Sequence, residues 1–155
     1  MELPALTTHR IQTIVKQLDL GPVIQENDDS ILRFSNAHFV FSWLEQIQLF
    51  RIHGYWAGRA TDVDTHAKLT EFVRKKNHVL PCPRFHAIIS DQGEMHVGFQ
   101  YYMPARTGLS DAQIANIIAM VMGNTSAAMD ELETVAPELV TWESSELSQS
   151  AGDEQ

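Results

Sequence analysis

The chain has 155 residues, 44% of them hydrophobic and 20% charged, which is the composition of one globular domain that can bury a core without disulfides. Its longest apolar run, residues 117–122, is far shorter than the roughly 20 residues that cross a membrane, and its lone cysteine, Cys82, cannot form an internal disulfide. The formal net charge is −9, so no surplus of basic residues is present to bind nucleic acid or an anionic membrane.

The first predicted element is a short amphipathic helix that begins after Thr7, a favourable N-cap residue. Apolar residues recur at helical spacing from Ile11 to Leu18. Gly21 and Pro22 follow, and we expect the glycine to supply the left-handed residue that ends the helix. The first twenty residues have no continuous apolar core, so we do not expect them to be a secretory signal. Together with the single thiol, this favours a cytoplasmic protein.

Four runs rich in β-branched and aromatic residues follow, at residues 23–27, 31–35, 38–44 and 47–56. Their connections are too short for parallel crossovers, so they predict an antiparallel meander. The last run has apolar residues on both faces, with Phe50 and Ile52 on one and Leu49 and Tyr55 on the other. We therefore expect a central strand that is covered on both sides.

A second helix is predicted to begin at Thr61 or Asp62, because acids occupy its first turn and basic residues 74–76 its last turn, as the helix dipole favours. Residues 81–83, Pro-Cys-Pro, force an extended link after it.

A hairpin follows, with a turn at residues 91–93 (Asp-Gln-Gly). A three-residue loop pairs Ser90 with Glu94, which places odd-numbered residues on one face and even-numbered residues on the other. The odd face is apolar and predicts the core, whereas the even face is mixed and wetter.

Ser110 is the predicted N-cap of a long last helix, whose apolar stripe runs from Ile114 to Leu132. Gly123 in its middle suggests close approach by another backbone. Residues 107–155 contain nine acids and no Lys or Arg, whereas residues 1–106 hold all eleven basic residues and the other eleven acids. We expect residues 143–155 to be a disordered acidic tail after a single domain, residues 1–142.

The predicted order is α-β-β-β-α-β-β-α, in which helices flank an antiparallel sheet, so the fold class is α+β.

The sequence contains no pattern that predicts a catalytic centre, a metal site or a cofactor. Glycine-rich phosphate loops and closely spaced His, Cys and Glu ligand motifs are absent from it. Asp62, Asp64 and His66 would spread around a helix axis, so we interpret the acids as dipole-complementing residues. Cys82 is interpreted as a packed linker residue, because linear spacing assigns it no Cys-His pair. His86 and His96 are predicted to be diagonal neighbours on the even face of the hairpin, where solvated histidines are more common than ligands. We therefore expect a non-enzymatic protein.

Several segments resemble the bacterial YbjN family of sensory transduction regulators. The resemblance runs from about Thr7 to Pro137 and is carried by residues 49–56, 77–85, 91–93 and 108–114. The family usually has a Trp just before the Asn of the second segment, where this chain has Lys76. The resemblance implies a fold similar to type III secretion chaperones, frequent dimers, and a regulator or protein-binding module without established enzymatic activity.

The leading hypothesis is a protein-interaction or chaperone-like regulatory module that holds a protein client or regulatory partner by the face or edge of its sheet. The candidate contact residues lie on the wetter face of the hairpin: His86, Ile88, His96, Gln100 and Tyr102.

Two further hypotheses accompany this one. The alternative function is a small-molecule sensor or enzyme with a pocket near Arg51, His53 and Tyr55, to which Tyr101 and Arg106 would also contribute. The other hypothesis is compatible with both functions: a homodimer in which the last helix meets a two-fold mate around Gly123 and its neighbouring methionines.

Overall fold

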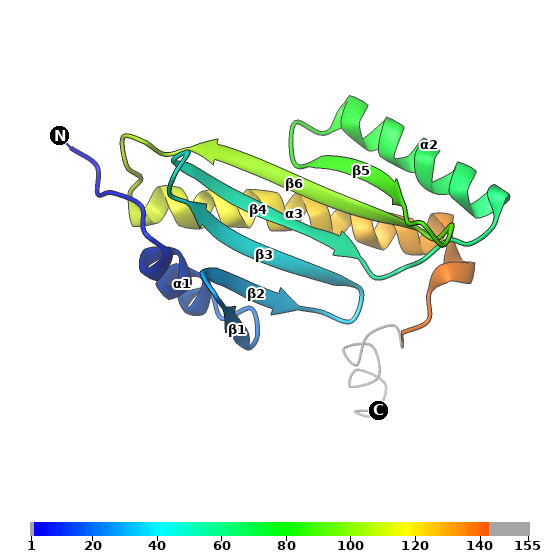
Figure 1. Cartoon of the computed structure of the whole chain (residues 1–155), viewed down its shortest axis with the longest axis horizontal. Coiled ribbons are helices and arrows are strands. Elements are labelled where there is room, and N and C mark those ends of the chain that lie inside the picture. Colours follow the sequence, from blue (N-terminus) through cyan, green and yellow to red (C-terminus); the bar gives the residue numbers. More distant parts are fainter. Residues whose placement is uncertain (1, 143–155) are drawn as a thin grey trace, which may run out of the picture.

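The computed structural model describes residues 2–142 and contains three α-helices and one six-stranded antiparallel sheet in this range (Figure 1). The helices are α1 (Thr8–Gln17), α2 (Val63–Val79) and α3 (Asp111–Val135), and a 3-10 turn follows at Pro137–Leu139. The strands are β1 (Val23–Glu26), β2 (Asp29–Arg33), β3 (Ala37–Leu44), β4 (Leu49–Trp56), β5 (Arg84–Ile89) and β6 (Met95–Pro104). The predicted α+β class is confirmed. Four strands separate α1 from α2, which agrees with the four predicted runs and is one more than the predicted element order contains.

The strand order in the sheet is β1-β2-β3-β4-β6-β5, so β4 lies between its sequence neighbour β3 and the distant strand β6. In the β5–β6 hairpin, the Ser90 amide donates to the Glu94 carbonyl at 2.8 Å, which confirms the predicted three-residue loop. The register follows from this loop and places His86 opposite Gly98 and Ile88 opposite His96.

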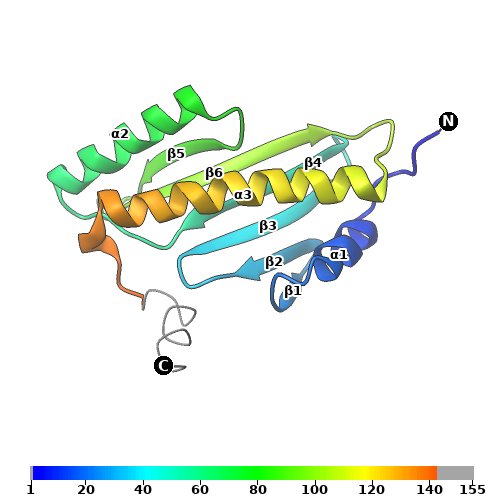
Figure 2. The ribbon, with the colours of Figure 1, turned by 180° about the vertical axis from the view of Figure 1, so that it is seen from behind.

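The helices pack on one side of the sheet, where α3 extends lengthwise over the central strands, α1 lies beside its first turns, and α2 packs against the edge strand β5 (Figure 2). The core between these layers is built from aromatic and aliphatic side chains, including the fully buried Phe39, Phe41, Ile52, Phe99 and Ile118. No helix within residues 2–142 covers the other side, which faces the viewer in Figure 1.

This one-sided arrangement corrects the expectation that β4 is covered on both faces. Phe50 and Ile52 are completely buried beneath the helices, but Arg51 and His53, which point to the opposite side, are only half-buried. The alternation of apolar and polar residues in the middle of β4 outweighs the apolar residues at its ends, as is usual in antiparallel sheets with one solvated face.

The helix starts are fixed by the predicted caps. Thr7 accepts a hydrogen bond from the Arg10 amide at 3.1 Å, Asp62 accepts one from the Thr65 amide, and Ser110 forms a reciprocal capping box with Gln113.

Two glycine predictions were wrong. The left-handed residue after α1 is Asp19, with φ of 53°, not Gly21, because α1 ends at Gln17. Gly123 is exposed, and a Cβ atom there would meet nothing within 4 Å, so no other backbone approaches it.

None of the helices described within residues 2–142 has the length and hydropathy of a membrane span. The predicted acidic tail, residues 143–155, lies outside the described residues.

Candidate functional site

The uncovered side of the sheet, which we call the open face, collects polar side chains from four adjacent strands. It is formed by alternate residues of each strand, because successive side chains point to opposite sides. Its polar and aromatic members in β3–β6 are His38, Ser42, Arg51, His53, Tyr55, Arg84, His86, His96, Gln100 and Tyr102.

All five predicted contact residues, His86, Ile88, His96, Gln100 and Tyr102, belong to the open face. Arg51, His53 and Tyr55, assigned to an alternative pocket from the sequence, belong to it too, because β4 pairs with β6. The two sets therefore form one surface. Tyr101 is not part of it, since it packs against the core on the other side of β6.

Cross-strand pairing builds the centre of this surface. His53 lies opposite Gln100, and Gln100 lies opposite Arg84, so these three side chains form a row across β4, β6 and β5. Arg51 lies opposite Tyr102 in the next row. Such neighbours are close enough to act together on one ligand.

An aromatic cluster around Tyr55 borders this centre. The Tyr55 hydroxyl and Nδ1 of His38 share a hydrogen bond of 2.8 Å, and the Arg59 guanidinium lies 5.2 Å above the centre of the Tyr55 ring. The rings of Tyr55 and His96 meet edge to face at 6.2 Å. Nε of Arg59 also pairs with Glu94 at 3.3 Å. These contacts hold the planar side chains in place.

Near Arg51 the polar contacts are incomplete. The Ser42 hydroxyl donates to Asp29 at 2.6 Å, and Nη2 of Arg51 approaches Ser42 at 3.5 Å, at the limit of a hydrogen bond. Nε of Arg51 and Nε2 of His53 are buried and have no partner within the described part of the chain. The centre of the face thus has hydrogen-bonding capacity that the fold does not use.

The four histidines of the open face share one direction of pKa change. Burial lowers the pKa of His53 and His86, and the positive charges of Arg51 and Arg84 add to the effect at these two residues respectively.

The pKa values of the two histidines beside Tyr55 are lowered in the same way. Burial lowers the pKa of His38, with Arg33 and then Arg59 adding to the effect, and burial followed by Arg59 lowers that of His96. The face is therefore charged at neutral pH chiefly by its arginines, with neutral imidazoles among them.

Sequence reasoning missed several residues of this surface, among them His38, Arg59 and Arg84. Arg84 could have been predicted, because it directly precedes the predicted hairpin strand and its even number places it on the wetter face. His38 required the β3–β4 register, which places it opposite Tyr55. Arg59 lies in the loop after β4, and no sequence pattern indicates that it stacks on Tyr55.

The other residues weighed from the sequence have structural contacts. Cys82 is 5% exposed, and the Asn124 side chain donates to its carbonyl at 2.9 Å. Asp62 caps α2, and Nε2 of His66 contacts the Ala60 carbonyl at 2.8 Å. Within residues 2–142, no group of three or more His, Cys, Asp or Glu side chains is placed to hold a metal ion.

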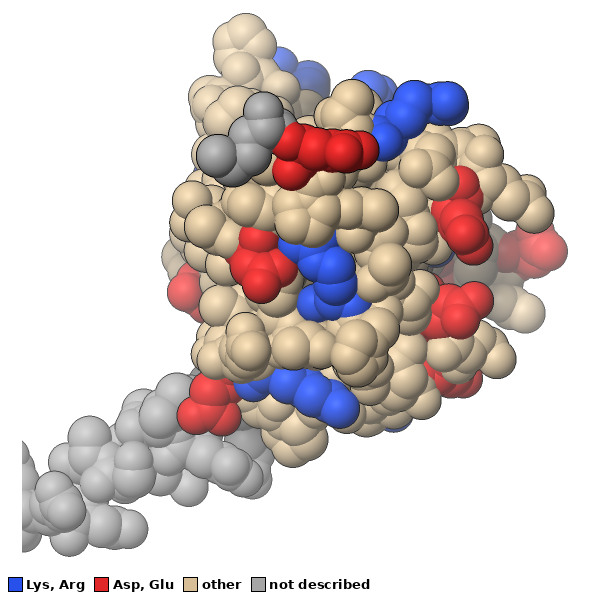
Figure 3. Space-filling model, turned by 90° about the vertical axis from the view of Figure 1, so that its left-hand side faces the viewer, with Lys and Arg blue, Asp and Glu red and all other residues tan. Residues whose placement is uncertain are grey.

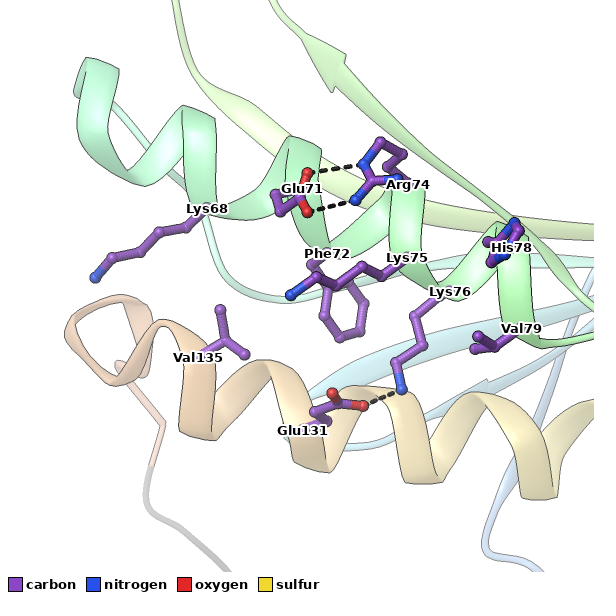
Figure 4. A pocket seen from close by; sticks show the side chains of 10 residues that line it. All are labelled: Lys68, Glu71, Phe72, Arg74, Lys75, Lys76, His78, Val79, Glu131 and Val135. Carbon is purple, nitrogen blue, oxygen red and sulfur yellow. Dashed lines mark hydrogen bonds and ion pairs between the residues drawn. The ribbon is translucent and has the colours of Figure 1, made fainter.

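A cavity of about 470 Å³ lies away from the open face, between α2 and α3 (Figure 4). Phe72 forms part of its wall, and Lys76 reaches across it from α2 to pair with Glu131 on α3. The Lys76 ammonium also lies 5.6 Å from the centre of the Phe72 ring. Lys76, the residue that departs from the family pattern, thus bridges two helices with a charged side chain.

Comparisons with known proteins agree with the fold. Residues 7–134 match the YbjN family, described as "Putative bacterial sensory transduction regulator". The crystal structure of YbjN from E. coli, described as "a putative transcription regulator", superposes with a TM-score of 0.71 over 85% of this chain and 95% of that chain, at 8% sequence identity. At this identity the similarity shows the fold alone. No curated protein matches the sequence. Since the family match spans most of the chain, the protein belongs to the YbjN family.

Proposed function

We propose that this protein is a non-enzymatic regulatory module that holds a protein client or regulatory partner on its open face. The observation that carries the proposal is the one-sided packing of the helices, which leaves a broad sheet surface uncovered within residues 2–142 (Figures 1 and 2). Exposed aromatic and apolar side chains lie on this surface, with Tyr102 42% and Ile88 45% exposed. Exposed aromatic and aliphatic side chains among arginines are typical of protein-interaction sites.

The chemistry of the surface favours docking over catalysis. Tyr and Arg are the side chains that most often dominate binding energy at protein interfaces, and here Arg51 lies directly opposite Tyr102. The polar groups are spread over four strands, and the described cavity of about 470 Å³ lies elsewhere, between α2 and α3. A chaperone-like mode of holding an extended segment is consistent with an open sheet.

Site-specific photo-crosslinking in bacterial cells tests the proposal. A photoreactive phenylalanine analogue replaces Tyr102 on the open face, and a matched control replaces Val63, which is 81% exposed at the start of α2. We expect the probe at 102 to capture one defined protein and the probe at 63 to capture none of it. Charge changes such as Ile88→Glu should abolish the capture at 102. Equal capture from both positions would refute the assignment of the face.

A second candidate function, a small-molecule sensor or enzyme near Arg51, His53 and Tyr55, has one observation in its favour: the unpartnered Nε of Arg51 and Nε2 of His53. A thermal-shift screen separates it from protein docking, because a ligand at about 100 times its Kd adds about 2.7 kcal/mol of stability. A ligand whose shift disappears in Arg51→Gln would favour the sensor.

We also propose a homodimer in the cytoplasm. The exposed side of α3, with Met120 and Gly123, is free of other elements within residues 2–142 and offers room for a two-fold mate. The buried thiol Cys82 suits a reducing compartment. Sedimentation equilibrium should show dimers at micromolar concentration, and a strict monomer would contradict this part of the proposal.

A further inference from the structure

We propose that the partner docks on the open face through an acidic segment, whose carboxylates meet the arginines and histidines of β4, β5 and β6. This inference rests on the proposed function and adds to it the chemistry of the partner. It follows from the distribution of charge over the face, the unused donors at its centre, and the exposed apolar side chains beside them.

The charge distribution is uneven along the sheet. Strands β4, β5 and β6 contain no Asp or Glu at any position, although the whole chain carries twenty acids and a formal net charge of −9. Arg51 and Arg84 project from this acid-free region, and they make no ion pair within residues 2–142. The acidic residues in the other strands of the sheet are Glu26 on β1 and Asp29 on β2.

Five of the nine other Lys and Arg residues in the described chain make ion pairs. Arg74 binds Glu71 at 2.7 Å, Lys68 binds Glu138 at 2.8 Å, and Arg10 binds Asp111 at 2.7 Å. The end of the molecule seen in Figure 3 likewise shows basic and acidic side chains interspersed. Arg51 and Arg84 thus combine two features, the lack of an ion pair within the described residues and a position on strands without acids, and this is the charge pattern that an acidic segment complements.

The unpartnered hydrogen-bonding groups of the open face also favour an acidic partner. Nε of Arg51, Nε2 of His53 and Nη1 of Arg59 have no acceptor within the described residues. An arginine Nε–H can only donate, and a carboxylate can only accept when ionised, so the two groups are complementary. Arg also binds carboxylates in a two-pronged geometry that lysine does not offer.

The apolar neighbours indicate that the ligand is a protein segment rather than a free anion. Tyr102 and Ile88 lie on the same face as Arg84 and His86, and both are more than 40% exposed. In an extended segment, acidic and apolar side chains can alternate, so one stretch of chain can contact both kinds of group.

The test is a fluorescence-anisotropy titration of the full chain at about pH 7.5 with a labelled peptide of about a dozen residues, in which Glu alternates with Val and Leu. A peptide with Gln in place of each Glu is the uncharged control. We expect the Glu peptide to bind about tenfold more tightly than the Gln peptide, which corresponds to about 1.4 kcal/mol. Raising the salt concentration from about 50 to 300 mM should reduce this difference, because salt screens charge pairs at the surface.

Protein variants locate the site. Arg51→Gln and Arg84→Gln should each weaken Glu-peptide binding about fivefold or more, whereas the matched control Arg74→Gln, on α2, should change it less than twofold. Equal binding of the Glu and Gln peptides, absence of Glu-peptide binding, or equal effects of Arg74→Gln and Arg84→Gln would each overturn the inference. Tighter binding of a labelled oligouridylate, lost in Arg51→Gln, would overturn it in favour of single-stranded RNA.

Failure of this inference is separable from failure of the proposed function. If Tyr102 crosslinks a defined protein while the Glu peptide binds no better than the Gln peptide, the open face docks a partner that is not acidic. If the probe at Tyr102 captures nothing beyond the control at Val63, the proposed function itself fails.

Discussion

At Gly54 the sheet has no room for a side chain. A Cβ atom there would overlap the carbonyl oxygen of His38 and would lie 2.7 Å from a ring carbon of Phe99. The absence of this atom lets the Phe39 and Phe99 rings pack with centroids 5.0 Å apart. Since a backbone atom blocks the position, Gly54→Ala must shift β3 against β4.

We expect Gly54→Ala to lower the free energy of unfolding by about 3 kcal/mol or more, as overpacking of a rigid core does. Urea denaturation followed by circular dichroism measures the change. Gly123→Ala is the matched control: its methyl group meets nothing within 4 Å, and alanine is the better helix former by about 1 kcal/mol, so it should stabilise. Equal effects of the two substitutions would contradict this account.

Gly98 also has a close neighbour, but a movable one. The atoms that a Cβ would meet there belong to the imidazole of His86, which lies over the glycine on the open face. We expect Gly98→Ala to fold and to push this ring outward, which relieves part of the burial that lowers the pKa of His86. An NMR titration of the His86 ring should therefore show its pKa rising toward the ordinary value of about 6.5. An unchanged His86 pKa would mean that the ring does not lie over Gly98.

At the scale of elements, Asn77 links the end of α2 to the start of β5. Its side-chain Nδ2 donates to the Phe85 carbonyl and its Oδ1 accepts from the Phe85 amide, both at 2.8 Å. Asn77 and Phe85 are the first and last residues of segment 77–85, which resembles the YbjN family. This part of the resemblance therefore reflects a structural contact.

We expect Asn77→Ala to lower the free energy of unfolding by about 1–3 kcal/mol, since two hydrogen bonds to the backbone are lost together. The control is Asn116→Ala, at an exposed position of α3 where the structure shows no side-chain hydrogen bond within residues 2–142. Thermal denaturation of both variants measures the loss of stability. A wild-type melting temperature for Asn77→Ala would refute the role of the link.

The elements that sequence reasoning predicted correctly are those fixed by neighbouring residues. Thr7, Asp62 and Ser110 cap the three helices as predicted, and the loop between Ser90 and Glu94 fixed the parity of the hairpin. The pairing of β4 with β6 was not predictable, because it joins residues about 50 positions apart and no local pattern encodes it. The side on which the helices pack is a tertiary property as well, so the uncovered face of β4 was missed.

At the scale of the whole molecule, the same limit explains what happened to the candidate site. The alternation of side chains in the hairpin predicted that His86 and His96 share one face. The alternation in the fourth predicted strand predicted that Arg51 and His53 share a face, and the two predictions were separate hypotheses. Only the β4–β6 pairing shows that both lie on one surface. Local periodicity therefore predicted two parts of the surface. The full extent of the surface depends on the strand order of the sheet, which local periodicity does not encode.

The open face also links stability to pH. His38, His53, His86 and His96 all have a pKa lowered by burial and by neighbouring arginines, so the unfolded chain, in which histidine has a pKa of about 6.5, binds protons first. Stability contributed by these neutral imidazoles is complete above about pH 7 and decreases as the pH falls through 6.5 toward the lowered values.

We therefore expect the free energy of unfolding to fall between about pH 7.5 and pH 5, a range in which most carboxylates remain ionised. Urea titrations at several pH values measure the slope. Replacing His53 and His86 together by Gln should flatten it, because two of the sites that resist protonation in the folded state are gone. Asn116→Ala, at an exposed position of α3, removes no titratable group and should leave the slope unchanged. Stability that rises on acidification would show that the face is not held together by neutral histidines.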